Sequence, residues 1–95
     1  MNTHSFSVSI VIPNWNGKHL LEKNLPSIFA AAPRAEVILA DDASQDGSVA
    51  LVKEKYPGVV IVENNHRKGF AGNVNSGVAR ATGEIVVLLN TDVRP

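Results

Sequence analysis

Polar residues of the kinds that bind nucleotides and metal ions occur in four short clusters, and each cluster directly follows a run of apolar residues. The clusters are Pro13-Asn14-Trp15-Asn16, Asp41-Asp42-Ala43-Ser44, Asn64-Asn65 and Asn90-Thr91-Asp92. Carboxylate and amide groups pair with the N–H and O–H groups of a base or a ribose. Carboxylate oxygens are also the ligands that Mg²⁺ and Mn²⁺ prefer. The clusters therefore predict a site for a nucleotide and a metal ion.

Trp15 is the only tryptophan of the chain and stands outside any apolar stripe. Its ring face can stack on a nucleobase, an interaction worth about 1–3 kcal/mol. The alternative is that the ring packs over the helix that follows. In the company of the other clusters, we favour stacking.

Asp41 and Asp42 stand side by side after the second apolar run. A carboxylate at such a strand end can accept a hydrogen bond from a base N–H or a ribose hydroxyl. We predict that Asp42 is this ligand group and that Asp41 is either structural or a secondary ligand. The alternative is that one of the two caps the following turn while the other is only solvated.

Asn90-Thr91-Asp92 is a degenerate form of an acid-x-acid pattern, in which carboxylates hold Mg²⁺ or Mn²⁺ against a substrate diphosphate. Such a cation offsets the charge on a departing diphosphate. The alternative is a simple turn, because Asn, Thr and Asp all favour turns. The position after the fourth apolar run favours the metal site, with Asp92 as its ligand.

The segment after Asn65 carries further candidates. Its glycine-rich stretch, residues 69–73, is predicted to open a helix whose free amides face an anion, although close packing of a helix start is an equal alternative. Asn73, Arg67 and Lys68 are candidates for contacts with a base, ribose or phosphate.

The elements that position these clusters alternate along the chain. Strands are predicted over residues 8–12, 36–40, 59–62 and 85–89, because these short β-branched or apolar runs are typical of buried parallel strands. Helices are predicted from about residue 18, after Asp46, and over residues 69–81. Right-handed crossovers then give an α/β, Rossmann-like parallel sheet with helices on both faces, which binds ligands at the carboxyl ends of its strands.

Three details of the helices are predicted as well. Asn16 and Asp46 are expected to cap the first and second helices. Pro26 is expected to kink or split the first helix, because proline removes a helical hydrogen bond. A stripe in the third helix is expected to face inward, and it consists of Phe70, Val74 and Val78.

Composition excludes several classes. The formal net charge is +0, which argues against a nucleic-acid partner. The chain has no cysteine, so disulfides, thiolate metal sites and a cysteine nucleophile are excluded, and a cytoplasmic protein is expected. The first residues lack the basic and apolar segments of a signal peptide, and no apolar run approaches the ~20 residues of a membrane helix.

Four sequence blocks, which contain the polar clusters described above and follow one another along nearly the whole chain, resemble those of family 2 glycosyltransferases. Residues 9–17 resemble the first strand and base-binding loop of that family, and residues 41–48 resemble its Asp-x-Ser-x-Asp-Gly-Ser run. Residues 65–77 are similar to the third block, and residues 81–92 to the fourth, which ends in the metal motif. The resemblance implies a GT-A fold of strand order 3-2-1-4 that binds a nucleotide-diphosphate sugar and transfers the sugar, with inversion, to a glycan, lipid-linked or protein acceptor.

The resemblance also implies roles for residues. Pro13 and Trp15 bracket the base, Asp42 contacts it, and Asp92 reaches the metal and diphosphate. The nucleotide-binding set implied is Pro13, Asn14, Trp15, Asn16, Asp42, Asn73 and Asn90. The chain departs from the family where Asn90 replaces an acid and Val93 follows Asp92, which leaves one carboxylate and predicts weaker metal binding.

Residues 1–95 are therefore expected to be the nucleotide-sugar-binding half of a GT-A domain, truncated after the metal motif. The catalytic base and the acceptor-binding half are expected outside this chain, so the isolated chain is expected to transfer no sugar. Any membrane association, at the inner face of the membrane, would come from those other parts.

Other classes fit less well. A nucleotidyltransferase would carry a Gly-rich basic loop after the first strand, and a dinucleotide-binding oxidoreductase would carry G-x-G-x-x-G there. A phospho-accepting signalling domain would have its acidic pair after the first strand rather than the second. A non-catalytic interaction module, in which the exposed edge of the sheet pairs with another copy, stays open as an alternative.

Overall fold

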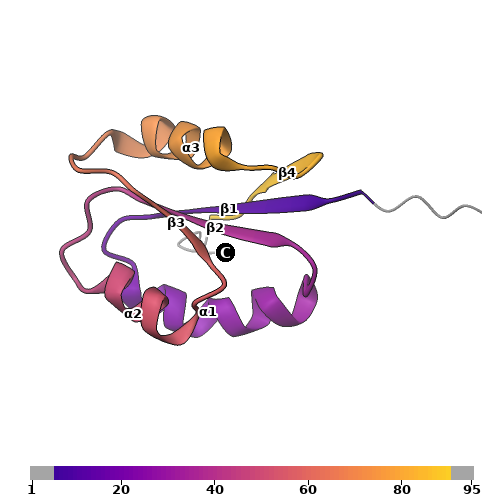
Figure 1. Ribbon diagram of the computed structural model, residues 1–95. Helices are drawn as coiled ribbons and strands as arrows, with labels where there is room; N and C mark the ends of the chain where they lie inside the picture. Colours follow the sequence, from indigo (N-terminus) through magenta and orange to yellow (C-terminus); the bar gives the residue numbers. More distant parts are fainter. Residues whose placement is uncertain (1–5, 91–95) are drawn as a thin grey trace, which may run out of the picture.

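Four parallel strands alternate with three helices in the computed structural model, which describes residues 6–90 (Figure 1). In chain order the elements are β1 (Val8–Asn14), α1 (Lys18–Ala31), β2 (Glu36–Asp41), α2 (Ser48–Lys55), β3 (Val60–Glu63), α3 (Gly69–Arg80) and β4 (Ile85–Leu88). The sheet order is β3-β2-β1-β4, and all three neighbouring pairs are parallel. The predicted fold class and strand order are confirmed.

The sheet separates two apolar layers. α1 and α2 cover one face and α3 covers the other (Figure 1). Because side chains alternate along a strand, Ile10 and Ile12 of β1 pack with α1 and α2, whereas Val11 lies on the α3 face with Ile38 and Ala40. Each apolar run thus contributes buried side chains to both faces of the sheet, which is why polar and apolar residues do not alternate along it.

β1 continues two residues beyond its predicted end. Pro13 pairs with Ala40 and Asn14 with Asp41 of β2, whereas the pairing of β1 with β4 stops at Val11. Proline cannot donate a ladder hydrogen bond, so it fits a strand where one side is unpaired. The prediction that the strand stops before Pro13 was wrong, and Pro13 and Asn14 sit on the sheet rather than in a loop.

α1 runs from Lys18 to Ala31 with Pro26 inside it, so of the two expected effects of this proline, a kink or a split, the split does not occur. Pro26 lacks the N–H that would bond to the carbonyl of Glu22. Both residues are exposed, so water can reach that carbonyl. Pro26 therefore destabilises the helix less than a proline on its buried side would.

α3 packs on the sheet through a different stripe from the predicted one. Its buried residues are Asn73 and Gly77, whereas Phe70 is 57% and Val78 44% exposed. A Cβ atom at Gly77 would lie 2.5 Å from Cγ1 of Val11. The missing side chain lets the helix backbone approach the sheet here, and the expected apolar stripe is rotated away from the core.

β4 lies at an edge of the sheet, as the predicted strand order requires, but its side chains are exposed, whereas its apolar composition predicted a buried strand. Its four residues are between 41% and 46% exposed. Its apolar composition cannot come from burial within residues 6–90, and it leaves an apolar surface at the β4 edge of the sheet.

We predict that Gly77→Val destabilises the fold by about 1–3 kcal/mol, because the new side chain overpacks the contact between α3 and the sheet. Gly58→Val is the matched control, since a Cβ atom at Gly58 meets nothing within 4 Å. Urea unfolding of both variants measures the difference. Equal stability of the two variants would contradict the close approach of α3.

Candidate functional site

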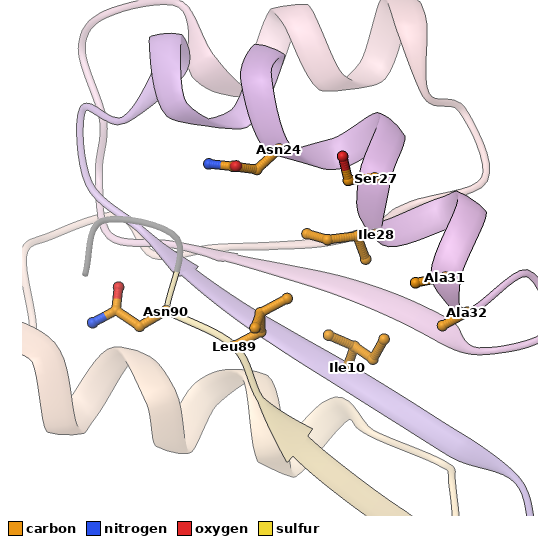
Figure 2. A pocket seen from close by; sticks show the side chains of 8 residues that line it. All are labelled: Ile10, Asn24, Ser27, Ile28, Ala31, Ala32, Leu89 and Asn90. Carbon is orange, nitrogen blue, oxygen red and sulfur yellow. The ribbon is translucent and has the colours of Figure 1, made fainter. Parts of the chain in front are cut away.

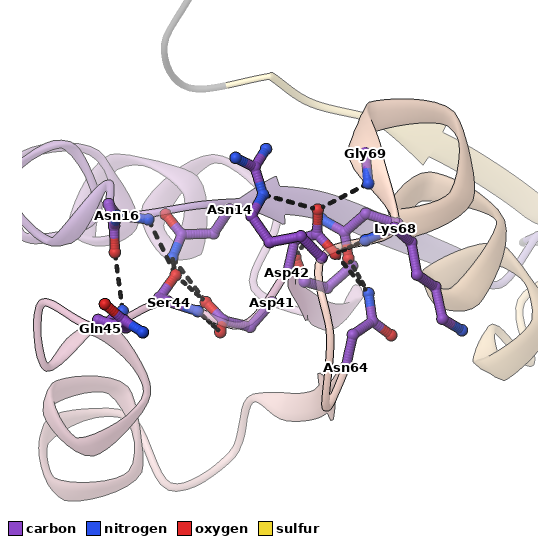
Figure 3. Close-up of polar contacts among 12 residues, drawn as sticks. Asn14, Asn16, Asp41, Asp42, Ser44, Gln45, Asn64, Lys68 and Gly69 are labelled. Atoms are coloured by element: carbon purple, nitrogen blue, oxygen red, sulfur yellow. Dashed lines mark hydrogen bonds and ion pairs between the residues drawn. The ribbon is translucent and has the colours of Figure 1, made fainter.

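Asp42 is a buried carboxylate, with a relative exposure of 1%, that lies directly after β2. Its Oδ1 accepts hydrogen bonds from the backbone N–H of Lys68 (2.8 Å) and from Nδ2 of Asn64 (3.1 Å). Its Oδ2 accepts from the N–H of Gly69 (3.0 Å), and Nε of Arg67 lies 3.5 Å from the same oxygen. Figure 3 shows Asp42 facing Asn64, Lys68 and Gly69, so one side chain joins β2 to the start of α3.

These contacts decide the ionisation of Asp42. Burial raises the pKa of the carboxyl, but the hydrogen bonds from Lys68, Asn64 and Gly69 and the contact with Arg67 outweigh it, so the pKa lies below its ordinary value of 3.8. Within the stretch 69–73, whose amides were predicted to face an anion, the amide of Gly69 faces this internal carboxylate. The dipole of α3 also favours the negatively charged form of Asp42, because this carboxylate lies at the N-terminal end of the helix.

Asp41 has a separate set of partners. Its oxygens accept hydrogen bonds from Nδ2 of Asn14 (2.9 Å), from the N–H of Ser44 (3.0 Å) and from Oγ of Ser44 (2.7 Å). It therefore fixes the turn after β2 and holds the side chain of Asn14 against it (Figure 3). All three of its partners belong to the protein's own framework.

Asn16 does not cap α1 as predicted. The cap position is Gly17, without a side-chain hydrogen bond, and Oδ1 of Asn16 accepts instead from the N–H of Gln45 (2.8 Å). The N–H of Asn16 donates to Oγ of Ser44 (2.9 Å). Asn16 thus fastens the loop after β1 to the loop after β2, which it reaches with a left-handed backbone (φ 51°).

Asp46 joins the first turns of two helices. Its Oδ1 accepts from the N–H (3.0 Å) and Oγ of Ser48 at the start of α2, and its Oδ2 accepts from the N–H of Lys18 (3.0 Å) at the start of α1. The predicted cap is therefore not found: the cap position of α2 is Gly47, without a side-chain hydrogen bond, and Asp46 stands one residue before it. The second bond, to α1, was not predicted because it joins residues 28 positions apart.

A cavity of about 160 Å³ lies among the carboxyl ends of the strands. It is lined by Pro13, Asn14, Trp15, Asp42, Arg67, Phe70, Asn73 and Asn90. Six of the seven residues implied for nucleotide binding therefore surround one space, and Asn16 is the one outside it. Asn73 also holds the wall in place, because its Nδ2 donates to the carbonyl of Ala40 (2.8 Å) and its Oδ1 accepts from Asn64 (2.9 Å).

Arg67 and Phe70 extend the site beyond that implied set. The Cζ atom of Arg67 lies 3.8 Å from the centroid of a Trp15 ring, and Trp15 itself is 50% exposed. Phe70 was assigned to the core from its spacing, yet it lines the cavity. The sequence feature that could have placed Phe70 in the site is its position in the glycine-rich stretch, residues 69–73. In this case that position is a better guide than the helical spacing, which predicted a core residue.

The described residues do not form a metal site. Within residues 6–90, no group of three His, Cys, Asp or Glu side chains could hold an ion. Asp42 does not fit a cation, because three N–H groups point at its oxygens and the positive Arg67 side chain lies at Oδ2. Thr91 and the predicted ligand Asp92 lie outside the described residues.

A larger apolar cavity of about 400 Å³ lies beside this site, between α1 and the end of β4. Figure 2 shows Ile10, Ile28 and Leu89 facing one another across it, with Asn24 and Asn90 toward the polar rim. Asn90 lines both cavities. The apolar cavity is therefore continuous with the rim.

The fold, a parallel sheet of order β3-β2-β1-β4 with helices on both faces, is that of GT-A glycosyltransferases. A mannosyltransferase from Pyrobaculum calidifontis, solved in complex with GDP-Man and Mn²⁺, superposes with a TM-score of 0.82 at 33% sequence identity, over 95% of this chain and 28% of that chain. Residues 9–95 match the model of a family described as "Glycosyl transferase family 2". The chain belongs to glycosyltransferase family 2.

Individual proteins that are similar to this chain are glycosyltransferases as well. The GalNAc(5)-diNAcBac-PP-undecaprenol beta-1,3-glucosyltransferase of Campylobacter jejuni is 32% identical over 90% of this chain, and the dolichol-phosphate mannosyltransferase of Saccharomyces cerevisiae is 31% identical over 95% of it. This chain spans 29% of the first relative and 37% of the second. Among the helices of residues 6–90, none is long and apolar enough to cross a membrane.

We predict that Asp42→Asn lowers the free energy of unfolding at pH 7 by about 1.5–3 kcal/mol, because the carboxylate accepts charge-assisted hydrogen bonds. The pKa of Asp42 is depressed by folding. Its contribution is therefore complete above the pKa of the unfolded carboxyl and is lost as the pH falls through the lower folded value.

Urea unfolding at pH 7 and near pH 3 checks this, with Glu63→Gln as the control. Glu63 is exposed, and its ion pair with Lys53 spans 3.9 Å. The gap between wild type and Asp42→Asn should narrow in acid, whereas Glu63→Gln should track wild type at both values. A gap that is independent of pH would refute the electrostatic role of Asp42.

Proposed function

We propose that this chain binds the donor of a glycosyltransferase, a nucleotide-diphosphate sugar, for inverting transfer of the sugar to an acceptor hydroxyl. The observation that carries the proposal is the cavity whose wall combines the Trp15 ring, the Asp42 carboxylate and the amides of Asn14 and Asn73. An aromatic face beside groups that bind base N–H and ribose O–H groups is the combination that a nucleoside requires.

The comparisons support the donor class. The similar Pyrobaculum enzyme holds GDP-Man, and the Campylobacter relative is named a glucosyltransferase. Both facts concern those proteins. For this chain they favour a nucleoside diphosphate sugar over a dinucleotide or a free sugar.

Within this proposal, the residues divide by role. Pro13 and Trp15 bracket the base, Asp42 contacts it, and Asn14, Asn73 and Asn90 contact the remaining nucleoside. Asp92 would hold Mg²⁺ or Mn²⁺, which would supply positive charge to the departing diphosphate. The Mn²⁺ of the Pyrobaculum complex supports a divalent ion.

We place the catalytic base and the acceptor site in residues beyond this chain, because the chain spans only about 30% of relatives such as the Campylobacter enzyme. An inverting mechanism needs a base that takes the proton of the acceptor hydroxyl. Sugar transfer catalysed by the 95-residue chain alone would contradict this placement.

Calorimetric titration with UDP, dTDP and GDP, with and without Mn²⁺, tests the donor site. We expect one nucleotide to bind best and Mn²⁺ to strengthen its binding in wild type but not in Asp92→Ala. Trp15→Ala should weaken binding by about 1–3 kcal/mol, or roughly 5- to 150-fold.

His19→Ala is the control for this series, because His19 is an exposed residue of α1 and no part of the cavity wall. It should bind as wild type does. Absence of binding to wild type up to millimolar nucleotide would overturn the donor site in this chain.

The exposed β4 edge favours a second candidate, a non-catalytic module that pairs with another copy. Edge strands with unpaired backbone groups add strands readily, and the side chains of Ile85 to Leu88 are apolar. The apolar cavity beside Leu89 enlarges the same surface (Figure 2).

If the edge is an interface, light scattering should show a mass that rises with concentration toward a dimer. Val87→Lys should keep the chain monomeric, because a lysine on an edge strand opposes strand addition. Glu22→Lys is the control, since Glu22 is an exposed residue of α1 far along the chain from β4. A monomer at all concentrations would remove this candidate.

A further inference from the structure

Arg67 makes two contacts at once in the proposed base site. Its guanidinium carbon lies 3.8 Å from the centroid of a Trp15 ring, and its Nε lies 3.5 Å from Oδ2 of Asp42. The Arg67 side chain is 51% exposed and that of Asp42 only 2%. The flat cation therefore reaches in from solvent and lies on the two groups that the proposed function assigns to the base.

The other three hydrogen-bond donors to Asp42 are held more rigidly than the side chain of Arg67. Two are backbone N–H groups, of Lys68 and Gly69, and the third is the amide of Asn64, which is 7% exposed. A carboxylate has about four acceptor positions. With three held by the framework and Arg67 at Oδ2, no position is left for an N–H group of a base.

The geometry also leaves no space for a base between the two side chains. A planar ring inserted between Trp15 and Arg67 would need its own van der Waals distance on both faces, about 7–8 Å in total. The separation is 3.8 Å. A base on this face of Trp15 must therefore take the place of Arg67.

We propose that Arg67 is an internal competitor of the nucleotide: it stacks on Trp15 and pairs with Asp42, and a base that binds there must displace it. The proposal rests on the proposed function, because it takes the Trp15 face and Asp42 as the base site. A guanidinium imitates a base in both respects that matter, since it is planar and offers N–H donors in its plane.

The expected effect of Arg67→Ala is tighter nucleotide binding. A cation–π contact and a half-exposed ion pair together correspond to about 3- to 30-fold in affinity. Loss of a positive charge acts in the opposite direction, because the nucleotide is an anion. Lys68→Ala corrects for this, since it removes one positive charge from the neighbouring residue.

Lys68 is a suitable control because its side chain takes no part in the competition. Its Nζ donates to Oγ of Ser76 (3.2 Å), and only its backbone N–H contacts Asp42. Alanine keeps that N–H. Lys68→Ala should therefore alter the charge near the site without freeing Trp15 or Asp42.

Calorimetry with UDP and GDP on wild type, Arg67→Ala and Lys68→Ala tests the proposal. Binding by Arg67→Ala that is tighter than by wild type, and about 3- to 30-fold tighter than by Lys68→Ala, supports it. Without nucleotide, the emission of Trp15 should change in Arg67→Ala and stay as in wild type in Lys68→Ala.

Two results would overturn the proposal, and they are distinguishable. If wild type binds nucleotide and Arg67→Ala binds no tighter than wild type, or no tighter than Lys68→Ala, Arg67 is not a competitor, while the donor site stands. If none of the three proteins binds UDP or GDP up to millimolar concentration, the proposed function fails in this chain and the role of Arg67 fails with it.

Discussion

The carboxylate of Asp42 is the constraint on which the rim of the sheet depends. It is buried, it stays ionised because backbone and amide N–H groups surround it, and it joins the end of β2 to the first residues of α3. Removing one partner of a buried charge costs far more than a typical hydrogen bond contributes. The position of the loop before α3, and with it one wall of the cavity, follows from this single group.

The neighbouring carboxylates complete a framework of the same kind. Asp41 fixes Asn14 and Ser44, and Asp46 joins the first turns of α1 and α2. Three acidic residues within six positions therefore each accept several hydrogen bonds from the ends of strands and helices. The acidic character of this block reflects construction of the rim as much as contact with a ligand.

Much of this architecture could be predicted from the sequence. Short apolar runs, each followed by polar residues, identified the parallel strands and the edge of the sheet where the polar clusters gather. The ligand role predicted for Asp42 stays a prediction, because both Asp41 and Asp42 accept hydrogen bonds from the protein's own groups. The errors have physical causes. Spacing placed Phe70 and Val78 inward, but Gly77 lets α3 approach the sheet along another stripe.

Other errors arose from interactions between distant residues. Asn16 is bound by Gln45 and not by the helix it precedes, and an edge strand such as β4 cannot be told from a buried one by composition. The contact of Arg67 with Trp15 joins residues that are far apart in the chain. None of these contacts leaves a periodic signal in the sequence.

The donors that hold Asp42 have a consequence for how this site can change over time. Two of the three close donors are backbone N–H groups, which every residue except proline possesses. Side chains at positions 67 and 68 can therefore be exchanged while the loop stays anchored. The hydrogen bonds that hold the loop therefore do not depend on which side chain stands at position 67, which lines the cavity, so the cavity wall can vary there without loss of the loop's position.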